Sequence, residues 1–319
     1  MKYELLIENK GKIQMPLVTD GVTWTTERRG TPGKLAFTVI KDESANFLEG
    51  NPVRLAVDDE KVFYGFVFTK KRSREQHIGV TAYDQLRYLL NKDTYVYSNK
   101  TASDVISMIA EDFQLQLGII ESTSFTIPTR TEDNVSLFEM VNNALDLELT
   151  NRKQMFVLFD DFGKIALKSL DNMKVDIIID EETGENFDYS STIDNDKYNR
   201  VKLSYENEDT GKREIYVVQD GNNINLWGLL QYYDTLQKGE NGEAKAAAIL
   251  DLYNAKTRKL KITKVFGDIR VRGGSLVIVK LALGDINVQN YMLVEKAVHT
   301  FNESEHFMDL TLRGGEFVG

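Results

Sequence analysis

Three pairs of adjacent carboxylates are the first candidates for chemistry in this sequence. They are Asp58–Asp59, Asp160–Asp161 and Glu181–Glu182. Two carboxyl groups can together protonate a leaving group and attack or activate water, as they do in glycosidases. Adjacent residues on a turn generally point apart, and all three pairs fall in segments of turn composition, where acidic side chains are expected to be solvated. We therefore predict no catalytic carboxylate pair.

Histidine can serve as a metal ligand or as a general acid and base, and the chain contains His77, His299 and His306. His299 and His306 lack a His-x-x-x-His spacing, and the sequence offers no third ligand beside them. Cysteine is absent, which excludes disulfides, thiolate metal sites and thiol nucleophiles. We predict hydrogen-bonded or surface histidines, and no catalytic, metal or cofactor-binding residue.

Nucleotide and nucleic-acid binding find little support in the sequence. Neither a Walker pattern nor a Gly-x-Gly-x-x-Gly before a helix occurs, and Gly273–Gly274 and Gly314–Gly315 are predicted to be bulges or turns. The chain has 39 Lys+Arg against 49 Asp+Glu, a formal net charge of −10, which argues against a generic nucleic-acid binder. The basic run 70–74 is predicted to be a solvated hairpin tip. We expect no sequence-specific partner among nucleic acids.

Membrane insertion is not expected either. No segment approaches the roughly 20 apolar residues that would cross a bilayer. Residues 1–8 alternate charged and apolar side chains and lack the basic start and apolar core of a signal peptide. We therefore expect a protein that is made in the bacterial cytoplasm and does not insert into a membrane.

Short apolar runs separated by turn residues dominate residues 1–83, as is typical of an antiparallel β-barrel. Turn residues interrupt the pattern at 31–33, 49–52 and 58–60. We predict that this region is the first of two tube-like barrels. Its expected strands are Tyr3–Ile7, Ile13–Val18, Val22–Glu27, Lys34–Ile40, Val53–Val57, Val62–Thr69 and Ile78–Tyr83.

Helical spacing follows, and residues 84–188 are predicted to form a mixed α+β domain. One helix is expected around Leu86–Leu90, and a second begins after Thr101 and stops at Gly118. A third begins at Ser136, where Ser136–Glu139 fits a capping box. A hairpin of residues 155–159 and 164–168, turned at 160–163, completes this domain.

Strands return in residues 189–221 and 265–319, which we assign to a second tube-like barrel. Residues 222–264 interrupt it as a helical insertion, because Ala244–Leu252 has high helix propensity, and they are grouped with the middle domain. The predicted fold class is α+β, mainly β: two antiparallel tube-like β-barrels, a mixed α/β middle domain and a helical insertion. The expected strands here are Arg200–Glu206, Glu214–Gln219, Leu260–Val265, Ser275–Leu281, Val288–Val294 and Phe307–Leu312.

The segment Val62–Phe68 is apolar on both faces of a predicted strand. In an antiparallel sheet one face usually meets the core and the other meets water, which produces alternation. Two explanations stay open: the neighbouring domain of the same chain covers the outer face, or another subunit does. Phe63, Phe66 and Phe68 are our candidates for a subunit interface.

Six segments of the chain, taken together, resemble the XkdQ/YqbQ-like proteins of phage tails and phage-derived contractile particles. No single segment is specific, but the set occurs in the family's order and covers nearly the whole chain. The segments are Gly21–Arg28, Phe63–Phe68, Thr81–Lys92, Asp196–Val201, Trp227–Gln231 and Leu293–Phe301.

This resemblance implies a structural baseplate hub, or tail-tip protein, without a cofactor. Hubs of this kind carry two tube-like barrels per chain and form a homotrimer, so that six barrels face the hexameric tail tube. The implied partners are the tail tube protein, the central spike protein and other baseplate proteins. The protein would be assembled into the tail of a phage or of a phage-tail-like bacteriocin, and released by lysis.

Two other functions stay open. A cell-wall hydrolase of the same tail would use some of the carboxylates described above as catalytic acids. A carbohydrate-binding tail module would need exposed aromatic platforms, and the only tryptophans are Trp24, within a predicted strand, and Trp227. We expect a structural protein rather than an enzyme.

Overall fold

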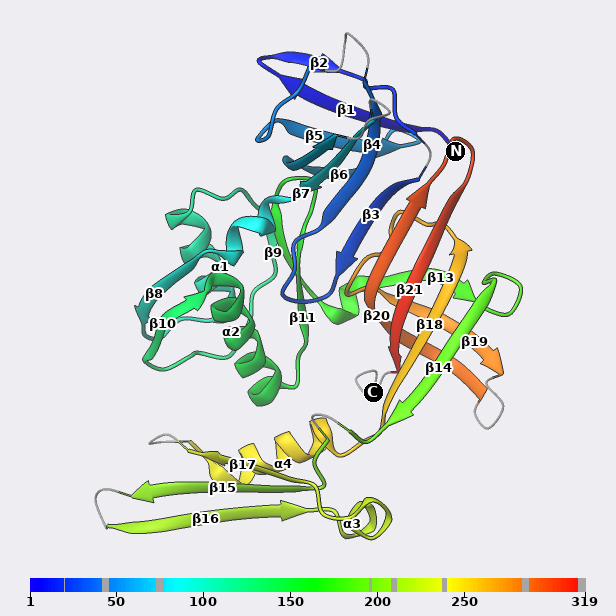
Figure 1. Ribbon diagram of the computed structural model, residues 1–319. Coiled ribbons are helices and arrows are strands. Elements are labelled where there is room, and N and C mark those ends of the chain that lie inside the picture. Colours follow the sequence, from blue (N-terminus) through cyan, green and yellow to red (C-terminus); the bar gives the residue numbers. More distant parts are fainter. Residues whose placement is uncertain are drawn as a thin grey trace.

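The computed structural model brings segments far apart in the sequence side by side, with a mainly β body above a smaller separate unit (Figure 1). It describes residues 1–19, 21–41, 46–72, 77–194, 197–207, 211–236, 240–282 and 287–314.

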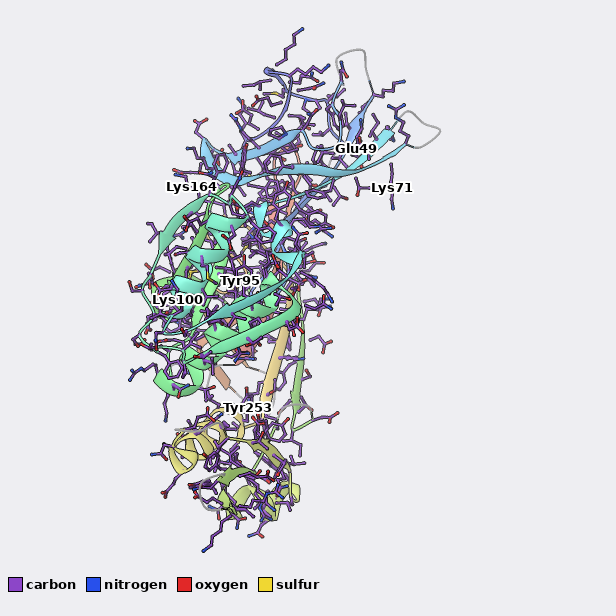
Figure 2. The ribbon with its side chains drawn as sticks, turned by 90° about the vertical axis from the view of Figure 1, so that its left-hand side faces the viewer. Glu49, Lys71, Tyr95, Lys100, Lys164 and Tyr253 are labelled. Carbon is purple, nitrogen blue, oxygen red and sulfur yellow. The ribbon has the colours of Figure 1, made fainter. Side chains whose placement is uncertain are left out.

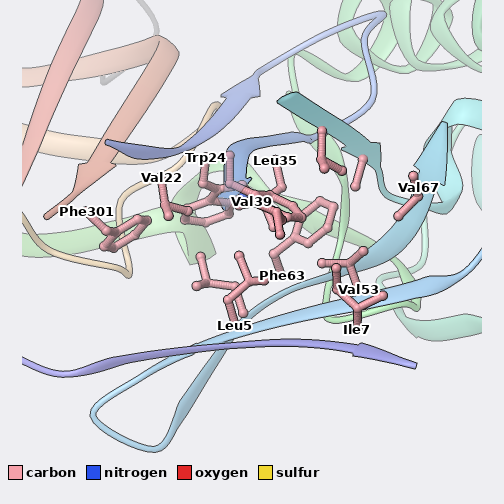
Figure 3. Close-up of a cluster of buried hydrophobic side chains, with 14 of the residues drawn as sticks. Leu5, Ile7, Val22, Trp24, Leu35, Val39, Val53, Phe63, Val67 and Phe301 are labelled. Atoms are coloured by element: carbon pink, nitrogen blue, oxygen red, sulfur yellow. The ribbon is translucent and has the colours of Figure 1, made fainter. Parts of the chain in front are cut away.

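Seven N-terminal strands curl around one apolar core. They run in the order β3–β4–β7–β6–β5–β1–β2, and each strand is antiparallel to its neighbours. Alternate residues point inward, among them Val22, Trp24 and Leu35, which lie together in Figure 3. The strands are β1 Tyr3–Asn9, β2 Lys12–Gln14, β3 Val22–Glu27, β4 Lys34–Ile40, β5 Pro52–Val57, β6 Glu60–Arg72 and β7 His77–Tyr83.

The predicted strands of this region are confirmed with one shortened. The run predicted at 13–18 forms a strand only as far as Gln14, after which Pro16 lies at a position that could not donate a ladder hydrogen bond. Val18 makes only an isolated bridge to Val39. The alternation of apolar and polar residues therefore predicted these strands, except where proline ended the strand.

Six later strands surround a second core in the order β13–β19–β20–β21–β18–β14. The β13–β19 pair is parallel and the others are antiparallel. Leu260, Val294 and Leu310 are among the side chains buried between them. The strands are β13 Lys174–Ile179, β14 Asn186–Thr192, β18 Thr257–Phe266, β19 Leu276–Ala282, β20 Asn287–Phe301 and β21 His306–Gly314.

The two strand groups are parts of one open sheet. β3 pairs antiparallel with β20, so that Val22 lies opposite Phe301 and Glu27 opposite Lys296, whose side chains form a 2.8 Å ion pair. Among the described residues, β13 and β14 are joined by a turn but do not pair, and β2 ends the other side of the sheet. The predicted mainly β, antiparallel class is confirmed. Two closed barrels are not confirmed, because the outer edge of β3 pairs with β20 and the combined sheet stays open among the described residues.

The middle of the chain packs two α-helices and two 3₁₀ helices against small sheets. The first predicted helix is a 3₁₀ helix, and the second ends at Asp112, so the predicted stop at Gly118 is wrong and that residue lies in a strand. Ser136 accepts the Glu139 amide at 3.2 Å, which is one of the two bonds of the predicted capping box. The elements are η1 Gln85–Leu90, β8 Lys92–Tyr97, α1 Ala102–Asp112, β9 Leu117–Ile120, β10 Arg130–Ser136, α2 Leu137–Arg152, β11 Phe156–Asp160, β12 Ile165–Ser169 and η2 Leu170–Met173.

A separate unit, which we call the insertion unit, lies between β14 and β18. It has a three-stranded sheet in the order β16–β15–β17, with one helix on one face. Its elements are β15 Arg200–Asn207, β16 Lys212–Gln219, α3 Gly221–Trp227, β17 Gln231–Thr235 and α4 Gly242–Tyr253. Figure 2 shows this unit, with Tyr253, below the rest of the molecule.

The strands predicted at 200–206 and 214–219 are present, but they pair with each other and with β17 instead of joining the C-terminal sheet. The predicted helical insertion contains a strand, β17, between its two helices. Residues 73–74 of the basic run predicted to be a hairpin tip, and Gly315 of the second predicted glycine turn, lie outside the described residues. None of the described helices combines the length and the apolar character needed to span a bilayer.

Candidate functional site

The outer face of β6 carries the aromatic residues that the sequence singled out. Phe63 points into the N-terminal core and is 3% exposed, so its side chain offers no surface to a partner. Phe66 and Phe68 point the other way and are half-buried. In the two-sided apolar pattern of β6, one face therefore lies in the N-terminal core and the other lies on the outside of the N-terminal strands.

The middle of the chain covers much of that outer face. The ring of Tyr88, in η1, lies 6.4 Å from the ring of Phe66 and 6.2 Å from that of Phe68. Tyr64 contacts Phe162, at the tip of the β11–β12 turn, with centroids 5.7 Å apart. Other residues of the same chain thus cover part of the outer face of β6, as the first of the two explanations requires.

A buried polar cluster lies where the three parts of the body meet. We call it the polar junction and define it as Asp84, Gln85, Asp160, Gly163 and Arg272. Asp84 accepts the amide of Gly33 at 2.8 Å and that of Leu86 at 3.1 Å. Gln85 donates to the Gly163 carbonyl at 2.6 Å. These bonds tie the end of β7 to β3–β4 on one side and to the β11–β12 turn on the other.

The absence of a side chain at Gly33 permits the contact between its backbone and Asp84. A Cβ at this position would lie 2.3 Å from Asp84 Oδ2, so any larger residue would push the carboxylate away from the backbone it caps.

The carboxylates of the polar junction have unusual proton affinities. Burial raises the pKa of Asp160 to about 6, although the Gly163 amide, 2.6 Å from Oδ1, and the Arg272 guanidinium act in the opposite direction. Burial, followed by repulsion from Asp160, raises the pKa of Asp84 well above its usual range. Among the described residues, Oδ2 of Asp160 is buried without a hydrogen-bond partner.

Arg272 supplies the positive charge of the polar junction. Its guanidinium lies between two rings, 5.5 Å from the centroid of Trp24 and 4.5 Å from that of Phe159. Burial lowers its pKa, and the charges of Asp160, Asp161 and Asp84 oppose that shift. The Arg272 guanidinium thus contacts both the N-terminal core, through Trp24, and the middle of the chain, through Phe159.

A carboxyl group with a pKa near 6 is the kind of group that general acid catalysis uses. Such a group also needs a substrate beside it. Three hollows among the described residues lie elsewhere: beside Arg29, beside Trp227 and along Met15. The arrangement fits a joint that positions three parts of the chain better than it fits an active site.

The remaining predicted pairs lie on turns. Asp58 and Asp59 are exposed, and the Asp58 carboxylate accepts the backbone amide of Lys2 at 2.7 Å. Glu181 and Glu182 are exposed in the β13–β14 turn. No group of three possible metal-ligating side chains occurs within the described parts of the chain.

Two of the histidines form a hydrogen-bonded pair, in which His299 is buried and His306 is half-buried. Hydrogen-bonded histidines were one of the two alternatives that we predicted. His299 Nε2 donates to the Val271 carbonyl at 2.8 Å, which leaves its Nδ1 to accept from His306 Nε2 at 2.9 Å. Burial lowers the pKa of His299 to about 3 and that of His306 to about 4. Both rings are therefore neutral near pH 7.

The two tryptophans differ in access. Trp24 is 3% exposed and packs on His299, with centroids 4.7 Å apart, so it offers no platform for a sugar. Trp227 is half-buried and lines a hollow of about 500 Å³ with Leu226 and Lys256.

Sequence reasoning missed Asp84, Gln85 and Arg272. A local signal existed for Asp84, because an aspartate directly before a helical run is typical of an N-cap, and Asp84 caps η1. Arg272 had none, because its partners lie more than a hundred residues away.

A family model described as YqbQ-like matches residues 22–313 of this chain. The chain is similar to two proteins of Bacillus subtilis (strain 168), each match covering 93% of this chain and 92% of the relative. The uncharacterized protein YqbQ is 27% identical over 309 residues, and the phage-like element PBSX protein XkdQ is 26% identical over 310 residues.

Solved structures share the fold at low identity. The tail protein from Neisseria meningitidis MC58 has a TM-score of 0.72 at 11% identity, covering 99% of this chain and 98% of that one. The 43 kDa tail protein of prophage MuSo2 from Shewanella oneidensis has a TM-score of 0.70 at 12% identity, with coverages of 97% and 98%. The E. coli c3393 protein, a component of the type VI secretion system, scores 0.58 at 12% identity, with coverages of 99% and 78%.

Proposed function

Because this chain belongs to the YqbQ-like family, we propose that it is a structural protein of the tail or baseplate of a phage or phage-tail-like particle. The family match over residues 22–313 carries this proposal. The fold supports it, since two tail proteins share it over nearly the full length of both chains. The protein would be made in the bacterial cytoplasm, assembled into the tail and released by lysis.

Within the particle, we propose the role of a trimeric baseplate hub that adapts the hexameric tail tube to the central spike. The support is the division of the large sheet into two strand groups, each around its own core. Three such chains would present six barrel-like units to a sixfold partner. A closed ring needs two unlike surfaces per chain, and two unlike units supply them.

Phe66 and Phe68 are proposed to contribute to the contact between subunits. Their side chains are half-buried against Tyr88 and keep part of their surface accessible. Phe63 would act only indirectly, by holding β6 in place from the core.

We propose that the protein is not an enzyme. The carboxylates with raised pKa values, Asp84 and Asp160, line none of the three hollows described above. Incubation of the purified chain with peptidoglycan is expected to release no more sugar or peptide than buffer. Release that Asp160→Asn abolishes would establish the hydrolase alternative.

Deletion of the gene from the producing strain tests the structural role directly. Electron microscopy is expected to show no assembled baseplates or tails, and expression of the intact chain should restore them. Normal tails in the deletion strain would refute the proposal. The trimer is tested separately by the mass of this protein in purified particles, where six copies per ring instead of three would refute the hub geometry.

A further inference from the structure

One face of the sheet in the insertion unit carries exposed apolar side chains. Helix α4 covers the other face, where it packs on Val201, Leu203 and Tyr216. The strand register places Lys202 between Val217 and Tyr233 on the uncovered face, and Ser204 beside Ile215. Ile215, Val217 and Tyr233 are 53%, 43% and 46% exposed. The outer face of a solvated sheet is normally polar, so this apolar surface indicates a partner.

Positive charge surrounds these apolar residues. Arg200, Lys202 and Arg213 lie on the uncovered face, and Glu206 is the acidic residue that shares it. None of the three basic side chains forms an ion pair with another described residue, although Arg213 donates to Ser204 Oγ at 3.4 Å and to the Tyr233 hydroxyl. In a chain of net charge −10, this face has an excess of unpaired positive charge.

Arg200 adds an unpaired donor. Its Nε is buried and has no hydrogen-bond partner among the described residues. A buried N–H without an acceptor is costly, and each instance in a native protein calls for an explanation. A carboxylate from a partner would supply the missing acceptor if the Arg200 side chain turned outward on binding.

The same chain carries the complementary surface at the open end of its large sheet. Residues 174–192, which contain β13, β14 and their turn, include six Asp+Glu and one Lys, so they account for half of the net charge of the chain. Glu181 and Glu182 are exposed there without an ion pair among the described residues, whereas Glu185 pairs with Lys264 at 2.6 Å and Asp188 lies opposite Lys261 of β18. Ile178 and Phe187, on the two strands that this turn joins, are 47% and 46% exposed, and Phe187 lies opposite the buried Ile262 on the face away from Asp188. We call residues 174–192 the acidic edge.

We propose that the uncovered face of the insertion unit docks onto the acidic edge of a second copy of this chain. Both surfaces have apolar residues within a charged surround, and the charges are of opposite sign, which orients the contact and excludes like surfaces. The two surfaces differ, so the contact is heterologous and propagates around a ring. This contact adds detail to the assembly role proposed above. It depends on that role only because it takes the partner to be another copy of the chain.

The decisive experiment measures self-association of the full-length chain by sedimentation velocity over a range of concentrations, at low and at physiological salt. Self-association is expected, with weakening as salt rises. Lys202→Glu and Glu182→Lys are each expected to weaken it at least tenfold. The double variant restores opposite charges at both positions, and we expect it to recover most of the affinity.

Lys212→Glu is the matched control, since it makes the same charge change on the same sheet but on the face turned toward α4. Circular dichroism of each variant checks that it folds. A chain that stays monomeric at all concentrations, or equal weakening by Lys202→Glu and Lys212→Glu, would overturn the inference. Binding of a single-stranded oligonucleotide that depends on Lys202, without self-association, would also overturn it. None of these outcomes would affect the deletion test of the tail role.

Discussion

Strand β6 and the sheet of the insertion unit both carry apolar side chains on two faces, yet only one of them is covered. The outer aromatic residues of β6 pack on Tyr88 and on Phe162 from the middle of the chain. Ile215 and Val217 of the insertion unit stay exposed. A two-sided apolar pattern therefore predicts that a strand is covered in its working state, but it does not say whether its own chain or another provides the cover.

The inner face of β6 should give the largest effect on stability. We expect Phe63→Ala to reduce the free energy of unfolding by about 3–5 kcal/mol, because the side chain fills the N-terminal core. Urea denaturation followed by circular dichroism measures the loss. Phe187→Ala, at an exposed phenylalanine, is the matched control, and an equal loss at both positions would contradict the assigned core.

The turn that covers β6 should show a dependence on pH. The pKa of Asp160 in the folded protein is about 6 against an ordinary value of 3.8, so its ionisation opposes folding as pH rises through 6. From pH 4.5 to pH 7.5 we expect Asp160→Asn to gain about 2 kcal/mol of stability relative to the unchanged protein. Urea denaturation at the two pH values tests this, with Asp161→Asn, at an exposed neighbour, as control. A gain that does not vary with pH would show that Asp160 ionises normally.

The outer face of β6 should give an intermediate effect. Phe66→Ala is expected to cost about 1–2 kcal/mol, since the ring is half-buried and contacts Tyr64 and Tyr88. The same urea measurement applies. A cost as large as that of Phe63→Ala would place both faces of β6 in equivalent cores, and no cost would mean that Tyr88 does not cover it.

The uncovered sheet should give the smallest effect. Val217→Ala is expected to change the free energy of unfolding by less than about 0.5 kcal/mol in the isolated chain, as is usual for surface positions. A loss above about 1 kcal/mol would show that this face is already covered and would remove the contrast with β6.

Local patterns predicted those elements whose faces differ in polarity. Strands Val22–Glu27 and Lys34–Ile40 were predicted to the residue, because their side chains alternate between core and surface. Strands β8 and β10 were missed, since most of their residues are polar or exposed and no period stands out. β17 was missed for a different reason, because it is a five-residue strand between two helices and was read as part of them.

Long-range pairing could not be predicted from local patterns. The sequence indicated strands at residues 22–27 and 288–294, but the part of β20 that pairs with β3 is 296–301, beyond the end of the predicted strand. The polar junction was missed for the same reason. Asp160 was considered as half of a turn pair with Asp161, whereas in the structure its neutral form is favoured by burial beside Asp84, a residue 76 positions earlier.

The pairing of β3 with β20 has a consequence for folding during translation. Phe301 belongs to the core that Val22 and Trp24 help to form. The N-terminal strand group therefore lacks its neighbouring strand β20 until residues up to Phe301 have been synthesised. At about 5–20 residues per second, translation of the intervening chain takes roughly 15–60 s. During this interval the edge of β3 and the rings beside it are open to wrong partners. We therefore expect a chain shortened before β20 to aggregate or to be retained by chaperones, although every strand of its first unit is present.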